Sequence, residues 1–116
     1  SISVGAPRNW AKALRAVRNT DGDMVSVSDE EILSAIPELA RKTGVFGEPA
    51  GVAAFAGFRK MAGEGKLGKD ERVAVVVTGN GLKDIESARK SVGAPIVSEP
   101  SIESFSVQLE RSGFQC

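Results

Sequence analysis

The sequence contains no histidine and no tyrosine, and its single cysteine, Cys116, is the last residue. Without histidine, neither a Ser-His-Asp nor a Cys-His nucleophilic system can form, and a His-based metal site is excluded. A lone cysteine is typical of a reducing compartment, and we interpret Cys116 as a surface thiol rather than a nucleophile. We therefore predict a cytoplasmic protein without a metal site, whose chemistry would depend on carboxylates, lysines, hydroxyls or a cofactor.

Excess charge and long apolar runs are also lacking. Fifteen basic residues balance fifteen acidic ones, so no net field would attract nucleic acid or an anionic membrane. No stretch approaches the ~20 apolar residues of a membrane helix, although a hydrophobic content of 41% is enough for a core. The sequence begins SISVGAPRNW, without an initiator methionine, so we expect a piece of something longer, or a processed chain.

The apolar periodicity and the turn residues predict alternating helices and strands. Helices are expected over residues 9–19, 28–42 with either a kink or a division into two short helices at Pro37, 49–63, 84–91 and 101–111. Strands are expected over residues 1–4, 24–27, 73–77 and 95–97. This order predicts a single α/β unit over residues 1–116. In the third helix, the small residues Ala53, Ala54 and Gly57 are expected to be positions of close contact.

The stretch VAVVVTGNGLKD, residues 73–84, contains the first candidate site. Its valine run is typical of a strand buried in a parallel sheet, and ligands bind beyond the carboxyl ends of such strands. The segment after it matches neither the Walker A loop nor the dinucleotide fingerprint. One interpretation is a tight turn whose glycines adopt positive φ, with Lys83 on the surface. The other is a cofactor site, where the Thr78 hydroxyl meets a ring atom and Gly79 lets the ring approach the backbone.

The segment GEPAG, residues 47–51, is the second candidate. Glu48 could simply be a carboxylate stabilised by the helix dipole, with Pro49 as the first helical residue and Ala50 and Gly51 as packing residues. Alternatively, Glu48 lies in the same cleft as Thr78 and faces a polar ligand. Each motif is weak alone, but the two in this order are more specific.

Together, GVFGEPAGVAAFAG and VAVVVTGNGLKD resemble the carboxyl-terminal part of the threonine synthase family, which are pyridoxal-phosphate enzymes of the tryptophan-synthase-β fold, or fold type II. SISVGAPRNWAKALRAV and VSVSDEEIL resemble the segments that precede it, so the likeness extends to about residue 90. The resemblance implies a three-layer large domain with a mostly parallel sheet flanked by helices. It also implies that this chain is the last third or so of a catalytic chain that forms a homodimer.

The resemblance implies roles for particular residues. Pyridoxal 5'-phosphate would be the cofactor, Thr78 would bind its pyridine nitrogen, and Gly79, Glu48 and Ala50 would lie near the ring. A hydroxyl partner leaves this nitrogen largely unprotonated, which favours β,γ-elimination and replacement over transamination. The family's Schiff-base lysine and phosphate loop belong to an earlier part of the chain, and no lysine here has that lysine's context. We therefore predict no catalytic residue in this sequence and no activity for it alone.

The implied reaction converts O-phospho-L-homoserine and water to L-threonine and phosphate. The expected partner is thus a phosphorylated amino acid, rather than nucleic acid or a membrane. A threonine or serine dehydratase remains an alternative because EPAG resembles that branch too, although dehydratases usually carry a serine-and-glycine turn in place of TGNGLK. A cysteate synthase acting on phosphoserine also remains open, as does a non-catalytic α/β binding or assembly module.

Overall fold

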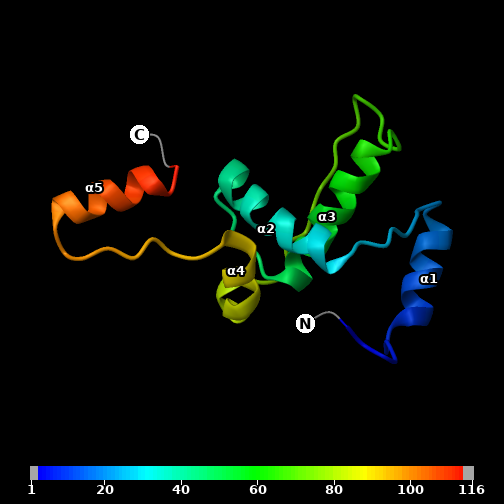
Figure 1. Cartoon of the computed structure of the whole chain (residues 1–116). Coiled ribbons are helices and arrows are strands. Elements are labelled where there is room, and N and C mark those ends of the chain that lie inside the picture. The colour runs from blue at the N-terminus through cyan, green and yellow to red at the C-terminus, as the bar shows by residue number, and fades with distance from the viewer. Residues whose placement is uncertain (1–2, 114–116) are drawn as a thin grey trace.

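The computed structural model describes residues 3–113, which fold into helices joined by extended connections (Figure 1). The elements are α1 (Trp10–Asn19), α2 (Asp29–Thr43), α3 (Pro49–Gly63), the 3-10 helix η1 (Gly81–Lys83), α4 (Ile85–Val92) and α5 (Ile102–Arg111). Every helix expected from the sequence is confirmed. Helix α2 continues through Pro37 as one helix instead of dividing into two.

The expected strands are not formed in the described residues, so this part of the molecule does not show a parallel sheet. Residues 3, 4, 24–27, 73–77 and 95–97 belong to no strand, while residues 1 and 2 lie outside the described range. Val73 and Val76 are 47% and 70% exposed, so the valine run is not buried on both faces. A strand needs a neighbour to pair its N–H and C=O groups, and nothing in this range pairs with the valine run as a strand.

The hydrophobic core lies between α2 and α3. Its buried side chains come from one face of α2 and from the first half of α3: Ile32, Ala35, Ile36, Leu39, Val52 and Ala56. The α2 members recur at intervals of three and four residues, which places them on one side of a helix. Phe46 and Val77, which flank the two candidate segments, pack against this core. The core therefore fixes the positions of both segments.

Helices α1 and α5 lie away from this centre (Figure 1). Neither helix contributes a buried residue, and large apolar side chains on both are exposed, including Trp10 and Ile102. Within residues 3–113, no helix combines the length and the hydropathy required to cross a bilayer.

The small residues of α3 divide into close contacts and open positions. Gly57 is buried, and a Cβ there would lie 2.9 Å from Cγ1 of Val25, which confirms a close approach. Ala53 is partly buried against the core. Ala54 is exposed, so the expectation of close contact is wrong for this residue. Ala54 lines an open groove between α3 and the valine run.

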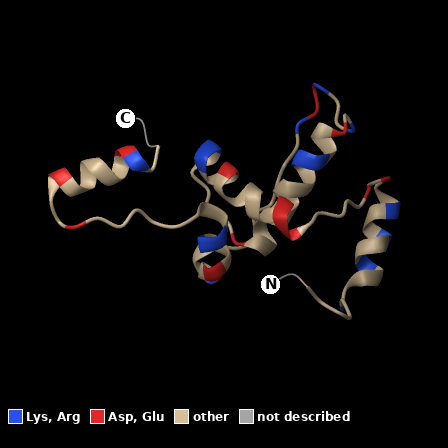
Figure 2. Ribbon diagram, viewed as in Figure 1, with Lys and Arg blue, Asp and Glu red and all other residues tan. Residues whose placement is uncertain are grey.

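Charge complementarity joins α2 to α3. The charged residues inside α1 and α3 are all basic, whereas α2, α4 and α5 carry both signs (Figure 2). Two of the basic residues of α3 pair with acidic residues of α2. Arg59 Nε lies 3.1 Å from Glu38 Oε2, and Lys60 Nζ lies 3.4 Å from Glu31 Oε1. Such exposed pairs contribute modestly each, typically about 0–1 kcal/mol.

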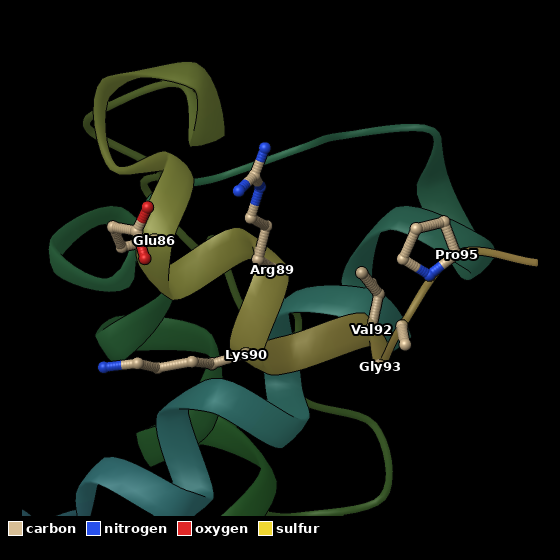
Figure 3. Close-up of a pocket in the computed structure, with 7 residues that line it drawn as sticks. Glu86, Arg89, Lys90, Val92, Gly93 and Pro95 are labelled. Carbon is tan, nitrogen blue, oxygen red and sulfur yellow. The ribbon is translucent and has the colours of Figure 1, made fainter. Parts of the chain in front are cut away.

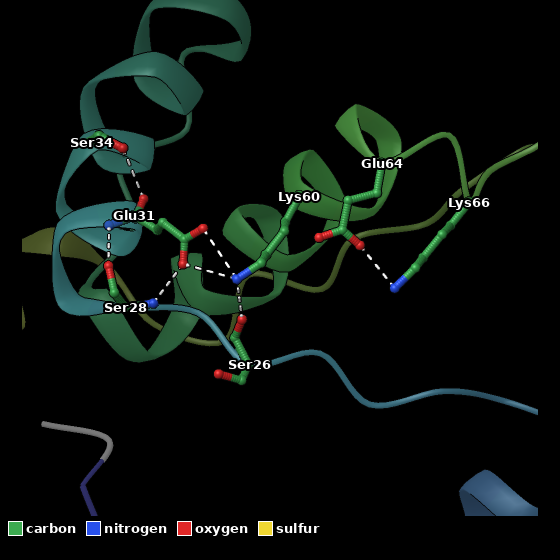
Figure 4. Close-up of polar contacts among 7 residues, drawn as sticks. All are labelled: Ser26, Ser28, Glu31, Ser34, Lys60, Glu64 and Lys66. Carbon is green, nitrogen blue, oxygen red and sulfur yellow. Dashed lines mark hydrogen bonds and ion pairs between the residues drawn. The ribbon is translucent and has the colours of Figure 1, made fainter.

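The start of α2 is a capping box, as its sequence predicts. Ser28 Oγ accepts from the Glu31 N–H at 3.2 Å, and Glu31 Oε2 accepts from the Ser28 N–H at 2.6 Å. Lys60 also donates to the carbonyl of Ser26 at 2.8 Å (Figure 4). Lys60 therefore ties the chain entering α2 to α3.

This capping box predicts a dependence of stability on pH. The Ser28 N–H lowers the pKa of Glu31 below its ordinary value of 4.5, and Lys60 adds to this effect. The pKa of Glu31 is lower in the folded state than in the unfolded state. The carboxylate therefore contributes its full stabilisation above the unfolded pKa, and this stabilisation is lost as pH falls through the folded pKa. We expect Glu31→Gln to lower the free energy of unfolding at neutral pH. The difference from wild type should shrink below pH ~4.5.

Urea unfolding from neutral pH down to pH ~3 would measure this difference. The control is Glu110→Gln on the separate helix α5, which should show no comparable convergence with wild type. A Glu31→Gln difference that stays constant over the whole pH range would contradict the prediction.

Candidate functional site

The two candidate segments, GEPAG and TGNGLK, lie side by side although they are about thirty residues apart in the sequence. The Glu48 N–H donates to the carbonyl of Gly79 at 3.0 Å, and the Gly81 N–H donates to the carbonyl of Phe46 at 3.0 Å. These two hydrogen bonds form an isolated antiparallel bridge between Gly47 and Asn80. The structure therefore brings together the segments that the sequence singles out.

The glycines of these segments allow this close approach. A Cβ on Gly51 would lie 3.0 Å from both the nitrogen and the oxygen of Gly79, and 3.2 Å from the nitrogen of Thr78. A Cβ on Gly81 would overlap the ring of Phe46. The interpretation of positive φ in this turn is wrong, since neither Gly79 nor Gly81 has one. These positions need glycine because of the space available.

Asparagine and aspartate organise the chain after this contact. Asn80 Oδ1 accepts from the Leu82 N–H at 2.9 Å and so caps η1. Asp84 Oδ1 accepts from the Ser87 N–H at 3.1 Å, which confirms the predicted start of α4. These local hydrogen bonds direct Lys83, between them, back toward GEPAG.

Glu48 is the only buried charged residue in the described part of the chain, with 8% of its surface exposed. Its Oε1 lies 2.9 Å from Nζ of Lys83. The carboxylate also fills the space beside Gly79, where a Cβ would overlap Oε1. Glu48 immediately precedes Pro49, the first residue of α3, so the helix dipole favours its negative charge.

Thr78 and Ala50 complete the set of predicted cofactor-binding residues. Thr78 is exposed, and its hydroxyl takes part in none of the hydrogen bonds found among residues 3–113. Ala50 is partly buried in the first turn of α3. The structure thus gathers Thr78, Gly79 and Glu48 around one contact, with Ala50 close by in sequence. Their role in binding a cofactor stays a prediction.

From the sequence, Lys83 is expected on the surface, facing either solvent or a nearby carboxylate, and the structure shows that it faces the carboxylate of Glu48. The contact of Gly51 with Gly79 was not expected from the sequence. One feature of the sequence could have indicated an ion pair at Glu48. A glutamate at the start of a glycine-rich apolar helix needs a cation beside it if it becomes buried. No pattern in the sequence shows which lysine would provide it.

A cavity of about 770 Å³ lies elsewhere, along α4 and the residues after it. It is lined by Glu86, Arg89, Lys90 and residues 92–95. Figure 3 shows the side chains of Glu86, Arg89 and Lys90 extending in different directions rather than converging. None of the predicted site residues lines it, and among residues 3–113 no group of three or more acidic, cysteine or histidine residues could hold a metal ion.

A match of residues 1–79 to the family described as "Pyridoxal-phosphate dependent enzyme" shows that this chain belongs to that family of enzymes. Several curated relatives confirm the resemblance to threonine synthases. The chain is 44% identical over 92 residues to the threonine synthase of Halalkalibacterium halodurans, a match that covers 79% of this chain and 26% of that protein.

Two further threonine synthases extend the comparison. That of Methanocaldococcus jannaschii is 43% identical over 96 residues, which is 83% of this chain and 24% of the relative. That of Mycobacterium tuberculosis strain H37Rv is 39% identical over 113 residues, which is 97% of this chain and 31% of the relative. The chain thus spans between 24% and 31% of the length of these relatives.

Proposed function

We propose that this chain forms the carboxyl-terminal part of a threonine synthase that converts O-phospho-L-homoserine and water to L-threonine and phosphate. The observation that carries the proposal is that relatives from several organisms, each named threonine synthase, are 37% to 45% identical to it. We refer to this chain, together with the additional sequence that such relatives possess, as the complete enzyme.

The residues at the contact fit one edge of a pyridoxal 5'-phosphate ring. A threonine hydroxyl can donate or accept a hydrogen bond, so Thr78 suits a pyridine nitrogen in either protonation state. Thr78 is exposed at the end of the valine run, which leaves its hydroxyl accessible to a ligand. When bound, the cofactor would supply an electron sink for elimination and replacement at the substrate's β and γ carbons.

Each predicted residue would then have a distinct task. Thr78 would orient the ring through its nitrogen, and Gly79 would let the ring lie close to the backbone on the side that the Glu48 carboxylate does not fill. Glu48 and Ala50, at the start of α3, would border the ring. The Schiff-base lysine and the phosphate-binding loop would come from the rest of the complete enzyme, which is why we expect this chain alone to be inactive.

The complete enzyme would also provide the sheet that residues 3–113 do not form by themselves. We infer that residues 73–77 join a mostly parallel, three-layer sheet of fold type II in a cytoplasmic homodimer. The extended, apolar and exposed character of the valine run supports this inference, because a sheet strand without its neighbours would present such a surface.

An assay of the complete enzyme tests the proposal and separates its rivals. We expect O-phospho-L-homoserine to yield L-threonine and phosphate in equal amounts. A dehydratase would instead release ammonia and a 2-oxo acid from threonine or serine, and a cysteate synthase would consume phosphoserine. A non-catalytic module would bind no pyridoxal 5'-phosphate.

The same assay on residues 1–116 alone should give no turnover, which controls for contaminating activity. A complete enzyme that is loaded with cofactor and releases no phosphate from O-phospho-L-homoserine would contradict the proposal.

A further inference from the structure

Glu48 makes three contacts across the site that nothing in its local sequence requires. Its backbone N–H donates to the carbonyl of Gly79, and its carboxylate lies where a Cβ of Gly79 would be. The same carboxylate pairs with Lys83, which is 35 residues further along the chain. Glu48 is therefore held on one side by Lys83 and lies against Gly79 on the other.

We propose that Lys83 is a positioning residue, which holds the Glu48 carboxylate against Gly79 and thereby fixes the place of Thr78. The importance of Thr78 rests on the proposed function above, whereas the Lys83–Glu48–Gly79 contacts belong to this structure itself. Glu48 then acts mainly as a support for the Thr78–Gly79 backbone, in addition to any contact of its own with the ring.

Burial explains why Lys83 would have this effect. The Glu48 side chain is only 10% exposed, whereas the Lys83 side chain is 65% exposed. Without Lys83, the carboxylate would be shielded from water with no cation beside it, which is unfavourable. The carboxylate would reach a state of lower free energy by rotating toward solvent, and this rotation would remove the support under Gly79.

The fold itself should tolerate the loss of Lys83. The α3 dipole still favours the Glu48 charge, and the backbone hydrogen bonds between the two segments do not involve Lys83. The core between α2 and α3 is also untouched. We therefore expect a defect in holding the cofactor, with little change in thermal stability.

A second ion pair of the same kind provides a matched control. Lys42 Nζ lies 2.9 Å from Glu38 Oε1 and is 68% exposed, so its distance and lysine exposure nearly equal those of the Lys83–Glu48 pair. It lies within α2, away from Thr78 and Gly79. Lys42→Met removes a lysine of similar exposure and pair distance without touching the candidate site, and it leaves Glu38, which is 24% exposed, paired with Arg59.

The test compares Lys83→Met, Lys83→Arg and Lys42→Met in the complete enzyme. Three quantities would be measured: the dissociation constant for pyridoxal 5'-phosphate, the visible absorbance of the bound cofactor without substrate, and exchange of the amide hydrogens of Glu48 and Gly81, which donate the two hydrogen bonds between the segments. We expect Lys83→Met to weaken cofactor binding about tenfold, between the effects typical of exposed and buried pairs. It should also shift the absorbance and speed exchange at both of these amides.

Lys83→Arg should restore most of the binding and the wild-type absorbance, because it keeps a cation near Glu48. Lys42→Met should match wild type in all three measurements. A Lys83→Met enzyme that binds the cofactor with wild-type affinity and absorbance would overturn the inference, whether or not its melting temperature is lower.

Failure of this inference can be distinguished from failure of the proposed function. If Thr78→Val binds the cofactor normally, the proposed role of the site is wrong. If Thr78→Val is impaired while Lys83→Met is normal, only the positioning role of Lys83 is overturned.

Discussion

Gly79→Ala is expected to lower the free energy of unfolding of this chain by about 1–3 kcal/mol, although it adds only one methyl group. The new Cβ would overlap Oε1 of Glu48 and lie 3.0 Å from its Cγ. The glutamate side chain is held here by its 2.9 Å pair with Lys83, so part of the overlap would be relieved by shifting the Gly79 backbone, against which Gly51 packs closely. Urea unfolding of residues 1–116, followed by far-ultraviolet circular dichroism, would measure the loss.

Gly63→Ala is the matched control for this substitution. Gly63 is the last residue of α3, and a Cβ there would meet nothing within 4 Å. Because alanine favours the helix over glycine, Gly63→Ala should leave stability unchanged or raise it by less than about 1 kcal/mol. If Gly79→Ala proves equally harmless, the Glu48 side chain is free to move and its close contact with Gly79 carries little energy.

A double-mutant cycle identifies the source of the loss at Gly79. Glu48→Ala removes the three atoms that a Cβ on Gly79 would meet, so in that background Gly79→Ala should cost much less than in wild type. Equal costs in the two backgrounds would show that the strain has another origin, such as the packing of Gly51 against the Gly79 backbone.

Helix positions could be predicted from the sequence because the signals that define them are local. Ser28, Asp84 and Ser101 each accept a hydrogen bond from a backbone N–H three residues later. Pro49 begins α3 for an equally local reason, since its fixed φ suits the first helical position. These signals need only a few neighbouring residues, so they do not depend on the rest of the molecule.

The strands could not be predicted in the same way, because strand pairing is not local. The valine run has the composition of a buried strand, yet in the described structure it meets α3 and the core rather than another strand. Its composition indicates what it can pair with, whereas the partner must be supplied by other segments.

The candidate site also combines features that the sequence could predict with contacts that depend on distant segments. The sequence indicated GEPAG and TGNGLK as related segments through a family resemblance, and the structure places them in contact. The Glu48–Lys83 pair and the space requirement at Gly79 arise only once the two segments meet. Neither can be derived from either segment alone.

Thr78→Val should weaken cofactor binding to the complete enzyme by about 1–3 kcal/mol, the cost of leaving a buried ring nitrogen without its partner. Turnover should fall strongly as well, because the ring loses the group that orients it. Stability of the cofactor-free protein should change by less than about 0.5 kcal/mol, since Thr78 is exposed. Cofactor content, visible absorbance, turnover and thermal unfolding would be compared with wild type.

Thr43→Val is the control, because it should lower stability without weakening cofactor binding, the reverse of what is expected for Thr78→Val. The Thr43 hydroxyl donates to the carbonyl of Leu39 at 2.7 Å and accepts from the Val45 N–H at 3.1 Å. Its loss should therefore lower stability by about 1 kcal/mol and leave cofactor binding intact. Thr78→Ser, which keeps the hydroxyl, should retain most of the cofactor. If Thr78→Val matches wild type in cofactor content, absorbance and turnover, Thr78 does not bind the ring, and the assignment of this site to the cofactor is wrong.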